Sequence, residues 1–432
     1  MRRANQNAGT AEGRERTPEP PGRRVLMITL AVPYPHGGSH RQRPWSLIRA
    51  LRDEGWEITL ITQARGVARE FPESLPLLCR EVDLVATPGA RASANSARAG
   101  ASGLRFDAVG EEWEVSPQIT IAARRHLEHG GFAAVLCDQF HARAALPPQP
   151  PAPVIVDVQR LEHEWLRDYA NRAPTGVERL YARLRARKLR RWEAREAVGV
   201  YALAAGSAPE ATQLRRLHPA IRVALLPEVV DTAEYEDKAG EEQAELVLCS
   251  GASDEPSDCD ALSQFVSAAW PEIRRRRPSA RLRVAGALPQ PDLLRQIEIT
   301  PGAEAAGKIE DLQADLARAA VCVLLPGRPS SGERMKLLEA AAMAKPILST
   351  PAGAEGLDFQ PGVEILITDE PNRLAACAVE LMANPERRRA LGQRARQRVE
   401  RDYSLPALRR ALAELLEPLA QAKTMAAGGA EP

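Results

Sequence analysis

The chain has 432 residues, a net charge of +1, 44% hydrophobic residues and 27% charged residues. These values are typical of a globular protein of two or three domains. The near-neutral charge argues against a basic surface that would attract the phosphates of a nucleic acid. An aromatic content of only 4% argues against a surface on which bases would stack. We therefore expect no nucleic-acid partner.

The cysteines and the hydropathy pattern favour a cytoplasmic protein. None of the six cysteines belongs to a C-x-x-C pair or to a His/Cys cluster with zinc spacing. Several lie in apolar runs, so we expect buried, reduced thiols. No stretch approaches the roughly 20 apolar residues of a membrane span, and the N-terminus lacks the apolar core of a signal peptide.

The first half of the chain has the pattern of an α/β domain. Residues 1–22 are rich in Arg, Glu, Pro and Gly without periodicity and predict a disordered tail. RVLMIT and EITLIT predict two strands joined by a loop and a helix. Further buried strands are expected in AAVLC, PVIVDV, VYALAAG and VALLP. We expect the first domain to span residues 23–231.

The pattern restarts after an acidic, unpatterned segment, residues 232–244, which we interpret as a linker. ELVLCSG, RLRVAG, VCVLLP, PILST and EILIT predict strands, and helices alternate with them, so residues 245–403 are expected to form a second parallel sheet. Residues 404–432 predict a C-terminal helix and tail that packs back across the first domain. Two such domains place a cleft at the carboxyl ends of their strands, where helix N-termini favour phosphate groups.

A run in the second half carries a family resemblance. The segment LLPGRPSSGERMKLLEAAAMAKPILSTPAGAEGL resembles the donor-binding core of retaining GT-B glycosyltransferases of family four, the glycosyl transferases group 1, whose block contains L-E-A-M-A-x-G-x-P-V-x-S. RRRALGQRARQRVERDYS, RVLMITLAVPYP and PVIVDVQRLEHE resemble other parts of that family. The resemblance covers most of the chain from Arg24 to Ser404. It implies the GT-B fold, two Rossmann-like doubly wound domains facing across a cleft, and a nucleotide-diphosphate sugar as donor substrate.

The resemblance also implies a donor site at the start of one helix. Glu339 would accept hydrogen bonds from both ribose hydroxyls, and Gly332 would let backbone N–H groups approach the diphosphate. Arg334 and Lys336 would neutralise the leaving nucleotide through charge-assisted bonds, with an exposed, solvated helix start as the other interpretation. The remaining donor-binding candidates are Gly251, Ile309, which would pack on the base, Ser331 and Met335.

The site departs from the family pattern. Many members carry two glutamates eight positions apart, but the earlier position here is Ser331, and the Arg and Lys that commonly follow Gly251 are absent. A branch resembling this chain carries Arg and Lys in the loop, as at Arg334 and Lys336, so the phosphate contact is expected there. Two alternatives stay open: a catalytically silent nucleotide-sugar-binding protein and a GT-B sugar-nucleotide epimerase.

The first loop of the first domain is the candidate acceptor or diphosphate loop. Gly37 and Gly38 would allow close backbone approach. Arg41 and Arg43 would face either phosphate or solvent.

Two residues at strand ends are catalytic candidates. His141 ends AAVLCDQFH, and Glu355 lies between two glycines after PILST. A structural role stays open for both, since a lone histidine is more often structural and Glu355 fits a turn. His163 in RLEHEW is a second histidine candidate. The family's frequent D-x-H-N is absent, because DVQR stands in its place.

Two further features bear on partners. The helix expected at residues 176–197 is very basic and predicts either a solvated structural face or contact with an anionic membrane surface. Asp258-Cys259-Asp260 matches the D-x-D motif, which binds a metal in another transferase fold. We interpret the match here as coincidental. We expect no metal and no cofactor beyond the donor.

Together these features predict transfer of a sugar from a nucleotide-diphosphate sugar to an acceptor hydroxyl with retention. As the resemblance implies, an oxygen of the departing phosphate would help deprotonate the acceptor, while the protein positions the substrates and stabilises the developing charge. The acceptor can be a saccharide, a lipid-linked sugar or a small natural product, and the sugar and base stay open.

Overall fold

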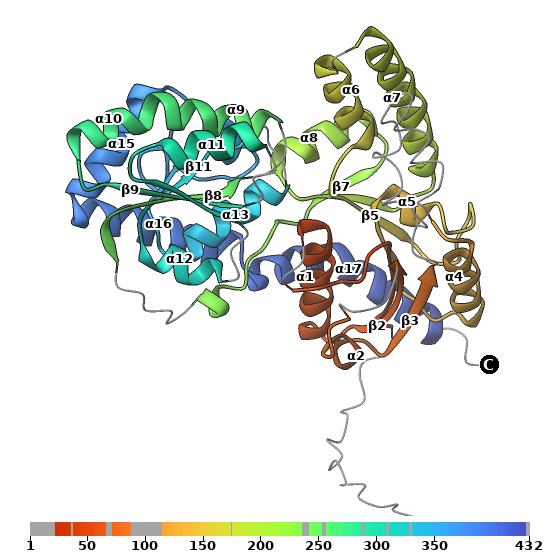
Figure 1. Ribbon diagram of the computed structural model, residues 1–432. Coiled ribbons are helices and arrows are strands. Elements are labelled where there is room, and N and C mark those ends of the chain that lie inside the picture. Colours follow the sequence, from red (N-terminus) through yellow and green to blue (C-terminus); the bar gives the residue numbers. More distant parts are fainter. Residues whose placement is uncertain are drawn as a thin grey trace, which may run out of the picture.

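The computed structural model describes residues 22–35, 38–65, 71–87, 115–173, 175–235, 242–252, 256–286, 290–307, 311–327 and 331–428. The chain forms two lobes, each built on one parallel sheet with helices on both faces (Figure 1). The strand order is β3-β2-β1-β4-β5-β6-β7 in the first sheet and β10-β9-β8-β11-β12-β13 in the second. The predicted pair of Rossmann-like doubly wound domains is confirmed.

The first domain alternates strands and helices along the chain. Its strands are β1 (Arg24–Thr29), β2 (Glu57–Arg65), β3 (Glu81–Thr87), β4 (Ala134–Asp138), β5 (Val154–Val158), β6 (Ala202–Ala205) and β7 (Arg222–Leu225). Its helices are α1 (Ser39–Asp53), α2 (Leu75–Leu78), α4 (Pro117–His129), α5 (Gln139–Arg143), α6 (Glu162–Arg172), α7 (Gly176–Glu196) and α8 (Ala208–Leu217). A short 3-10 helix, η3 (Thr232–Tyr235), follows.

The second domain repeats the pattern. Its strands are β8 (Gln243–Ala252), β9 (Arg281–Gly286), β10 (Ala303–Gly307), β11 (Ala319–Leu324), β12 (Ile347–Ser349) and β13 (Leu366–Ile367). Its helices are α9 (Pro256–Gln264), the π-helix η4 (Phe265–Ala269), α10 (Trp270–Arg276), α11 (Pro291–Ile299), α12 (Leu312–Arg318), α13 (Ser331–Ala342), α14 (Pro351–Ala354), α15 (Pro371–Ala383) and α16 (Pro385–Asp402).

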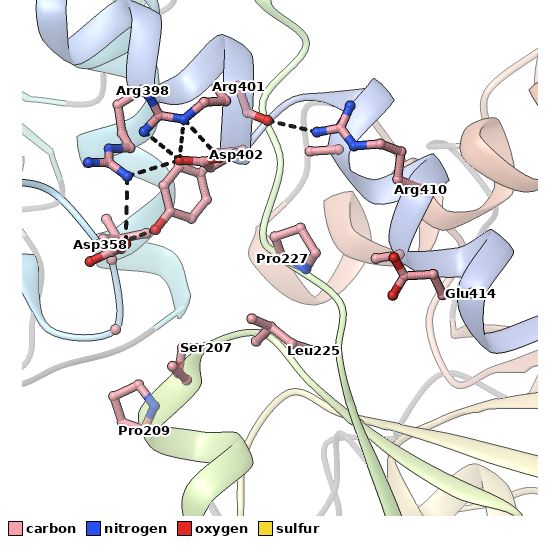
Figure 2. Close-up of a pocket in the computed structure, with 17 residues that line it drawn as sticks. Ser207, Pro209, Leu225, Pro227, Asp358, Arg398, Arg401, Asp402, Arg410 and Glu414 are labelled. Atoms are coloured by element: carbon pink, nitrogen blue, oxygen red, sulfur yellow. Dashed lines mark hydrogen bonds and ion pairs between the residues drawn. The ribbon is translucent and has the colours of Figure 1, made fainter.

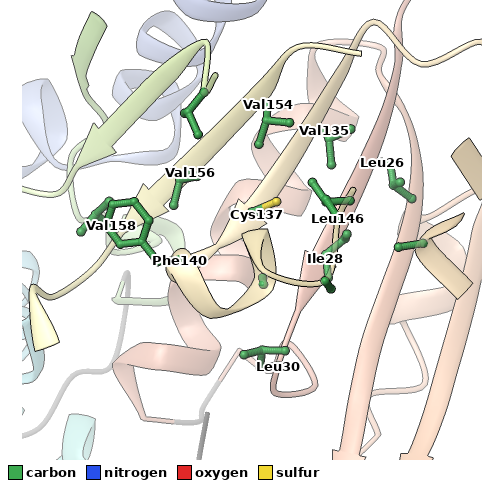
Figure 3. Packing of buried hydrophobic residues seen from close by; sticks show 14 of the residues in the cluster. Leu26, Ile28, Leu30, Val135, Cys137, Phe140, Leu146, Val154, Val156 and Val158 are labelled. Atoms are coloured by element: carbon green, nitrogen blue, oxygen red, sulfur yellow. The ribbon is translucent and has the colours of Figure 1, made fainter. Parts of the chain in front are cut away.

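The central strands of the first sheet are buried on both faces, and their sequences are therefore apolar runs. In β4 and β5 every residue is buried, as expected where helices cover both faces of a parallel sheet. On one face, side chains such as Leu26, Val135 and Val156 pack in one cluster beside Phe140 (Figure 3). This rigid layer holds the carboxyl ends of the strands, and with them the first residues of the following loops, in place.

The last helix, α17 (Leu405–Gly428), returns to the first domain. In Figure 1 it lies in the lobe of β1–β3, beside α1, although it follows the second domain in sequence. Leu408, Leu412 and Leu415, at helical spacing, are buried in the core cluster that covers the second face of the first sheet. The chain therefore crosses between the lobes twice, once after β7 and once at the end of α16.

Two further expectations concern membranes and thiols. Among the described helices, none is long and apolar enough to cross a bilayer. The cysteines, all of which are described, form no disulfide, and all except Cys377 are buried. Burial raises the pKa of the Cys137 and Cys322 thiols to about 12, so these groups stay protonated and contribute as small apolar side chains.

Candidate functional site

A pocket of about 490 Å³ opens where the two domains meet. Its lining comes from three parts of the chain: the loop and helix after β1, the crossover after β7, and α13 together with the start of α12. The lining residues are Pro35, Gln42, Trp45, Ser46, Arg49, Val229, Val230, Asp231, Glu234, Tyr235, Asp311, Leu312, Gln313, Met335 and Glu339. Two predicted donor-site residues, Met335 and Glu339, therefore face a cavity bounded by both domains.

Glu339 is the best-defined polar group of this pocket. The Tyr235 hydroxyl donates a hydrogen bond to its carboxylate. Burial raises the pKa of Glu339 to about 7, although the Tyr235 hydrogen bond and the charge of Lys336 both lower it. A carboxylate that is partly shielded from water and already accepts one hydroxyl hydrogen bond is suited to accept hydrogen bonds from sugar hydroxyls as well. Tyr235 was not predicted, because it lies in the acidic segment interpreted as a linker.

The start of α13 carries the other donor candidates. Ser331 is the first helical residue and Gly332 the second, so backbone N–H groups that lack partners inside the helix lie here. Lys336 is partly exposed, one turn before Glu339. Ile309, the predicted base contact, and Gly37 lie outside the described residues.

Arg334 is buried and connects the two domains. Its Nη2 donates to Glu210 Oε1 at 2.9 Å and lies 3.6 Å from Glu228 Oε1. Glu210 belongs to α8 of the first domain, and Glu228 belongs to the crossover after β7. The Nε of Arg334 and Oε2 of Glu210 are buried without a hydrogen-bond partner among the described residues. The cation predicted to meet phosphate thus lies at the domain boundary, and its contact with a donor stays a prediction.

Arg43 corrects an expectation. We expected it to face phosphate or solvent, but it is buried and donates from Nε and Nη2 to the two carboxylate oxygens of Asp157, each at 2.7 Å. Its Nη2 also donates to the carbonyl oxygen of Leu226 at 3.0 Å, and Glu228 lies 3.5 Å away. Arg43 therefore ties α1 to the end of β5 and to the crossover after β7.

The rest of the first loop lies close to its own chain. Gly38 is exposed and caps α1 with an extended φ of −61°, so it is not held in a glycine-only conformation. The Arg41 Nε donates to the Val32 carbonyl at 2.9 Å, and its guanidinium lies 4.9 Å from the centroid of the Tyr34 ring.

His141 lies on α5, just beyond β4. Gln139, two residues earlier, has φ of 69°. Non-glycine residues seldom adopt this left-handed conformation, and it is found more often at functional sites. The His141 ring is 4.7 Å from the Trp192 ring. Burial, reinforced by the charge of Arg160, lowers its pKa to about 4, so the imidazole is neutral at physiological pH. It does not line the 490 Å³ pocket.

A buried carboxyl missed by the sequence interpretation lies next to this turn. Asp138 ends β4, accepts a hydrogen bond from Gln159 Nε2 at 2.6 Å, and has its other oxygen buried without a partner among the described residues. Burial, together with the charge of Asp157, raises the pKa of Asp138 to about 8. Asp138 is therefore largely a neutral acid at pH 7. The signal for it was an acidic residue ending an apolar strand.

The remaining candidates are placed as follows. Gly251 lies near the end of β8. Glu355 is exposed and caps the end of α14. The next residue, Gly356, has φ of +86° and lies so close to Ser207 of the first domain that an added Cβ would be 3.0 Å from the Ser207 Cβ. His163 is paired with buried Glu193, which fits a structural role.

The D-x-D segment lies at the start of α9. The Asp258 carboxylate accepts a hydrogen bond from the Gly327 N–H at 2.8 Å, so it holds the loop after β11. Among the described residues, no group of three or more His, Cys, Asp or Glu side chains is arranged to hold a metal ion.

A second pocket, of about 710 Å³, lies at the other crossing between the lobes. Figure 2 shows it lined by Ser207 and Pro209 from the start of α8, by Asp358, and by side chains from α16 and α17 that include Arg401, Arg410 and Glu414. Basic and acidic side chains alternate there. Arg401, for example, is paired with Asp402.

Comparisons with known proteins agree with this fold. Residues 244–384 match the family described as glycosyl transferases group 1, whereas no curated protein sequence matches the chain. The sucrose-phosphate synthase of Thermosynechococcus elongatus is similar in structure, with a TM-score of 0.67 and 16% identity over 93% of this chain and 100% of that one.

Two other solved structures show the same fold. Anabaena HepE in complex with UDP and glucose has a TM-score of 0.61 and 13% identity, covering 91% of this chain and 99% of that one. A glycosyltransferase of Rickettsia africae has a TM-score of 0.61 and 10% identity, covering 92% and 98%. The second domain matches the glycosyl transferases group 1, and the whole chain has the two-domain GT-B fold of these solved structures.

Proposed function

We propose that this glycosyltransferase moves a sugar from a nucleoside-diphosphate sugar to an acceptor hydroxyl, with retention and without a metal ion. The observation that carries the proposal is the half-buried Glu339 carboxylate, hydrogen-bonded to Tyr235 in a pocket that both domains line. A ribose fits this arrangement, because its two adjacent hydroxyls can donate to one carboxylate. The nucleoside would occupy the pocket beside Met335.

The diphosphate would extend from the ribose toward the first turn of α13. Backbone N–H groups at Ser331 and Gly332 and the positive end of the helix dipole stabilise negative charge there. Lys336 adds a cation on the same helix. The Arg334 Nε, which has no hydrogen-bond partner among the described residues, supports a further ligand for that side chain. These groups would take over the role that a divalent cation plays in other transferases.

The acceptor would approach from the first domain. The loop at Gly38 and Arg41 and the turn at Asp138 and His141 follow β1 and β4, which are neighbours in the sheet, so they lie along one edge of it. In the mechanism we propose, an oxygen of the departing diphosphate accepts the proton of the acceptor hydroxyl as the new glycosidic bond forms. Glu355 and His141 would position the sugar. Anabaena HepE was solved with UDP and glucose, which makes a UDP-sugar the first donor to test.

The stereochemistry can be checked directly. We expect a panel of nucleotide sugars, offered with saccharide and lipid-linked acceptors, to give a product whose anomeric proton coupling in NMR matches that of the donor. EDTA should leave the rate unchanged. An inverted product or loss of turnover in EDTA would contradict the proposal. Stereochemical exchange of the donor alone would identify an epimerase, and binding without turnover would identify a silent protein.

The raised pKa of Glu339 predicts a pH dependence of donor binding. The carboxyl group is largely protonated below its pKa of about 7, and only the charged form accepts two hydroxyls. The affinity for a nucleotide sugar should therefore fall by about tenfold between pH 8 and pH 6. Calorimetric titration measures this, and the diphosphate diester of the ligand does not itself titrate in that range. A Glu339→Gln variant should show no such slope, and an equal slope in that variant would refute the assignment.

A further inference from the structure

Helix α7 projects with α6 from the first domain beyond its sheet, at the top of Figure 1. It begins with a capping box between Thr175 and Glu178, so its first turn is fixed. Its buried side chains are Ala182, Ala186 and Glu193. These positions lie on one face, and the apolar side chains of the opposite face belong to none of the core clusters formed by the described residues.

The exposed face of α7 forms a single row. Positions 177, 181, 184, 188, 191 and 195 are separated alternately by four and three residues and so line up along the helix. The first three are Val177, Tyr181 and Leu184, which are 67%, 45% and 53% exposed, and Leu180 beside them is 61% exposed. The last three are Lys188, Arg191 and Arg195, all exposed. The row therefore changes from apolar to cationic half-way along the helix.

This concentration of apolar side chains is unlike the rest of the surface. Other exposed large apolar side chains in the described part of the chain, such as Leu77, Ile121, Ile299 and Met425, come from separate elements. Single exposed apolar residues are ordinary, whereas a contiguous group rimmed by charge marks an interaction surface.

The charge around the row identifies the kind of partner. The whole chain has a net charge of +1, yet α7 has an excess of five positive charges. Its basic residues are Arg179, Arg183, Arg185, Arg187, Lys188, Arg190, Arg191 and Arg195, against Glu178, Glu193 and Glu196. Of the acids, Glu193 is buried against His163 and Glu178 closes the capping box. The partner must offer anionic groups beside an apolar layer.

We propose that the exposed face of α7 docks on a membrane surface that contains anionic lipids. The apolar half, residues 177–184, would enter the boundary between headgroups and acyl chains, and the cationic half, residues 188–195, would bind lipid phosphates. A second copy of the chain fits this face less well. A parallel contact along the row would bring the two cationic halves together, and an antiparallel contact would place each cationic half on the apolar half of its partner. The inference does not depend on the sugar-transfer chemistry.

Vesicle flotation of the full chain tests the inference. Vesicles of equal parts phosphatidylglycerol and phosphatidylcholine should carry the protein, and pure phosphatidylcholine should not. A Leu180→Ser/Leu184→Ser variant and a Lys188→Glu/Arg191→Glu variant should each reduce the partition coefficient by about tenfold or more. High salt should weaken binding of the wild type, because it screens the charges. Circular dichroism confirms that each variant is folded.

Matched controls come from exposed residues elsewhere. Ile299→Ser removes an equally exposed apolar side chain from α11, and Arg295→Glu/Arg389→Glu changes the net charge equally on the second domain. Both should bind vesicles like the wild type. Equal binding by the α7 variants and their controls would overturn the inference. So would self-association in sedimentation that the α7 variants abolish, with no vesicle binding. Transfer to a water-soluble acceptor should be unaffected in either case.

Discussion

Glu339→Gln is expected to weaken the binding of a nucleoside diphosphate about ten- to a hundredfold. The carboxylate would accept two ribose hydroxyls, and hydrogen bonds to a charged group contribute about 1.5–3 kcal/mol. The glutamine amide has the same shape but only one accepting oxygen, which the Tyr235 hydroxyl engages. The fold should therefore survive while the ribose contact is lost. Calorimetric titration with UDP and with other nucleoside diphosphates gives the ratio of dissociation constants.

The matched control is Glu298→Gln on α11, an exposed carboxylate of the same domain with no part in the pocket. It should bind the nucleotide like the wild type. If Glu339→Gln also binds like the wild type, the ribose does not sit on this carboxylate and the donor site lies elsewhere.

Asp157→Ala is expected to have the largest effect on stability. It removes both carboxylate oxygens that pair with buried Arg43 and leaves the guanidinium charge in the interior. Breaking a buried pair in this way costs about 3–5 kcal/mol, and Glu228 at 3.5 Å should keep the value near the lower end. In thermal unfolding the first domain should melt roughly 10 °C lower.

The comparison is Glu380→Ala, which removes a carboxylate that is 46% exposed and that pairs with Arg387, itself 42% exposed. A surface pair contributes only about 0–1 kcal/mol, so this variant should melt close to the wild type. Similar losses for both variants would show that the Arg43 pair does not hold α1 and the crossover together.

The sequence predicted the elements with strong apolar runs and missed the weak ones. β1 and β9 have the predicted bounds, and α7 differs by one residue at its end. The strands β3 and β10 were not predicted. Both are edge strands in which only one neighbour stabilises the backbone, so neither needs a continuous apolar run. β10, with the sequence AEAAG, has no β-branched residue at all.

The candidate site was predictable where one segment carries it. Glu339, Met335 and the start of α13 lie together because they share one helix. Arg43, Arg334 and Tyr235 could not be placed, because their partners are distant in sequence: Asp157 is 114 residues from Arg43 and Glu210 is 124 residues from Arg334. Such pairs exist only once both domains have folded and met, and no local spacing encodes them.

A crystal structure with a bound nucleoside diphosphate tests the central claim most directly, because the described residues line more than one pocket between the lobes. Our account predicts that the ribose hydroxyls bind the Glu339 carboxylate in the 490 Å³ pocket beside Met335, with the diphosphate at the first turn of α13. A nucleotide bound instead in the 710 Å³ pocket near Ser207 and Arg401, with Glu339 still bonded only to Tyr235, would contradict it.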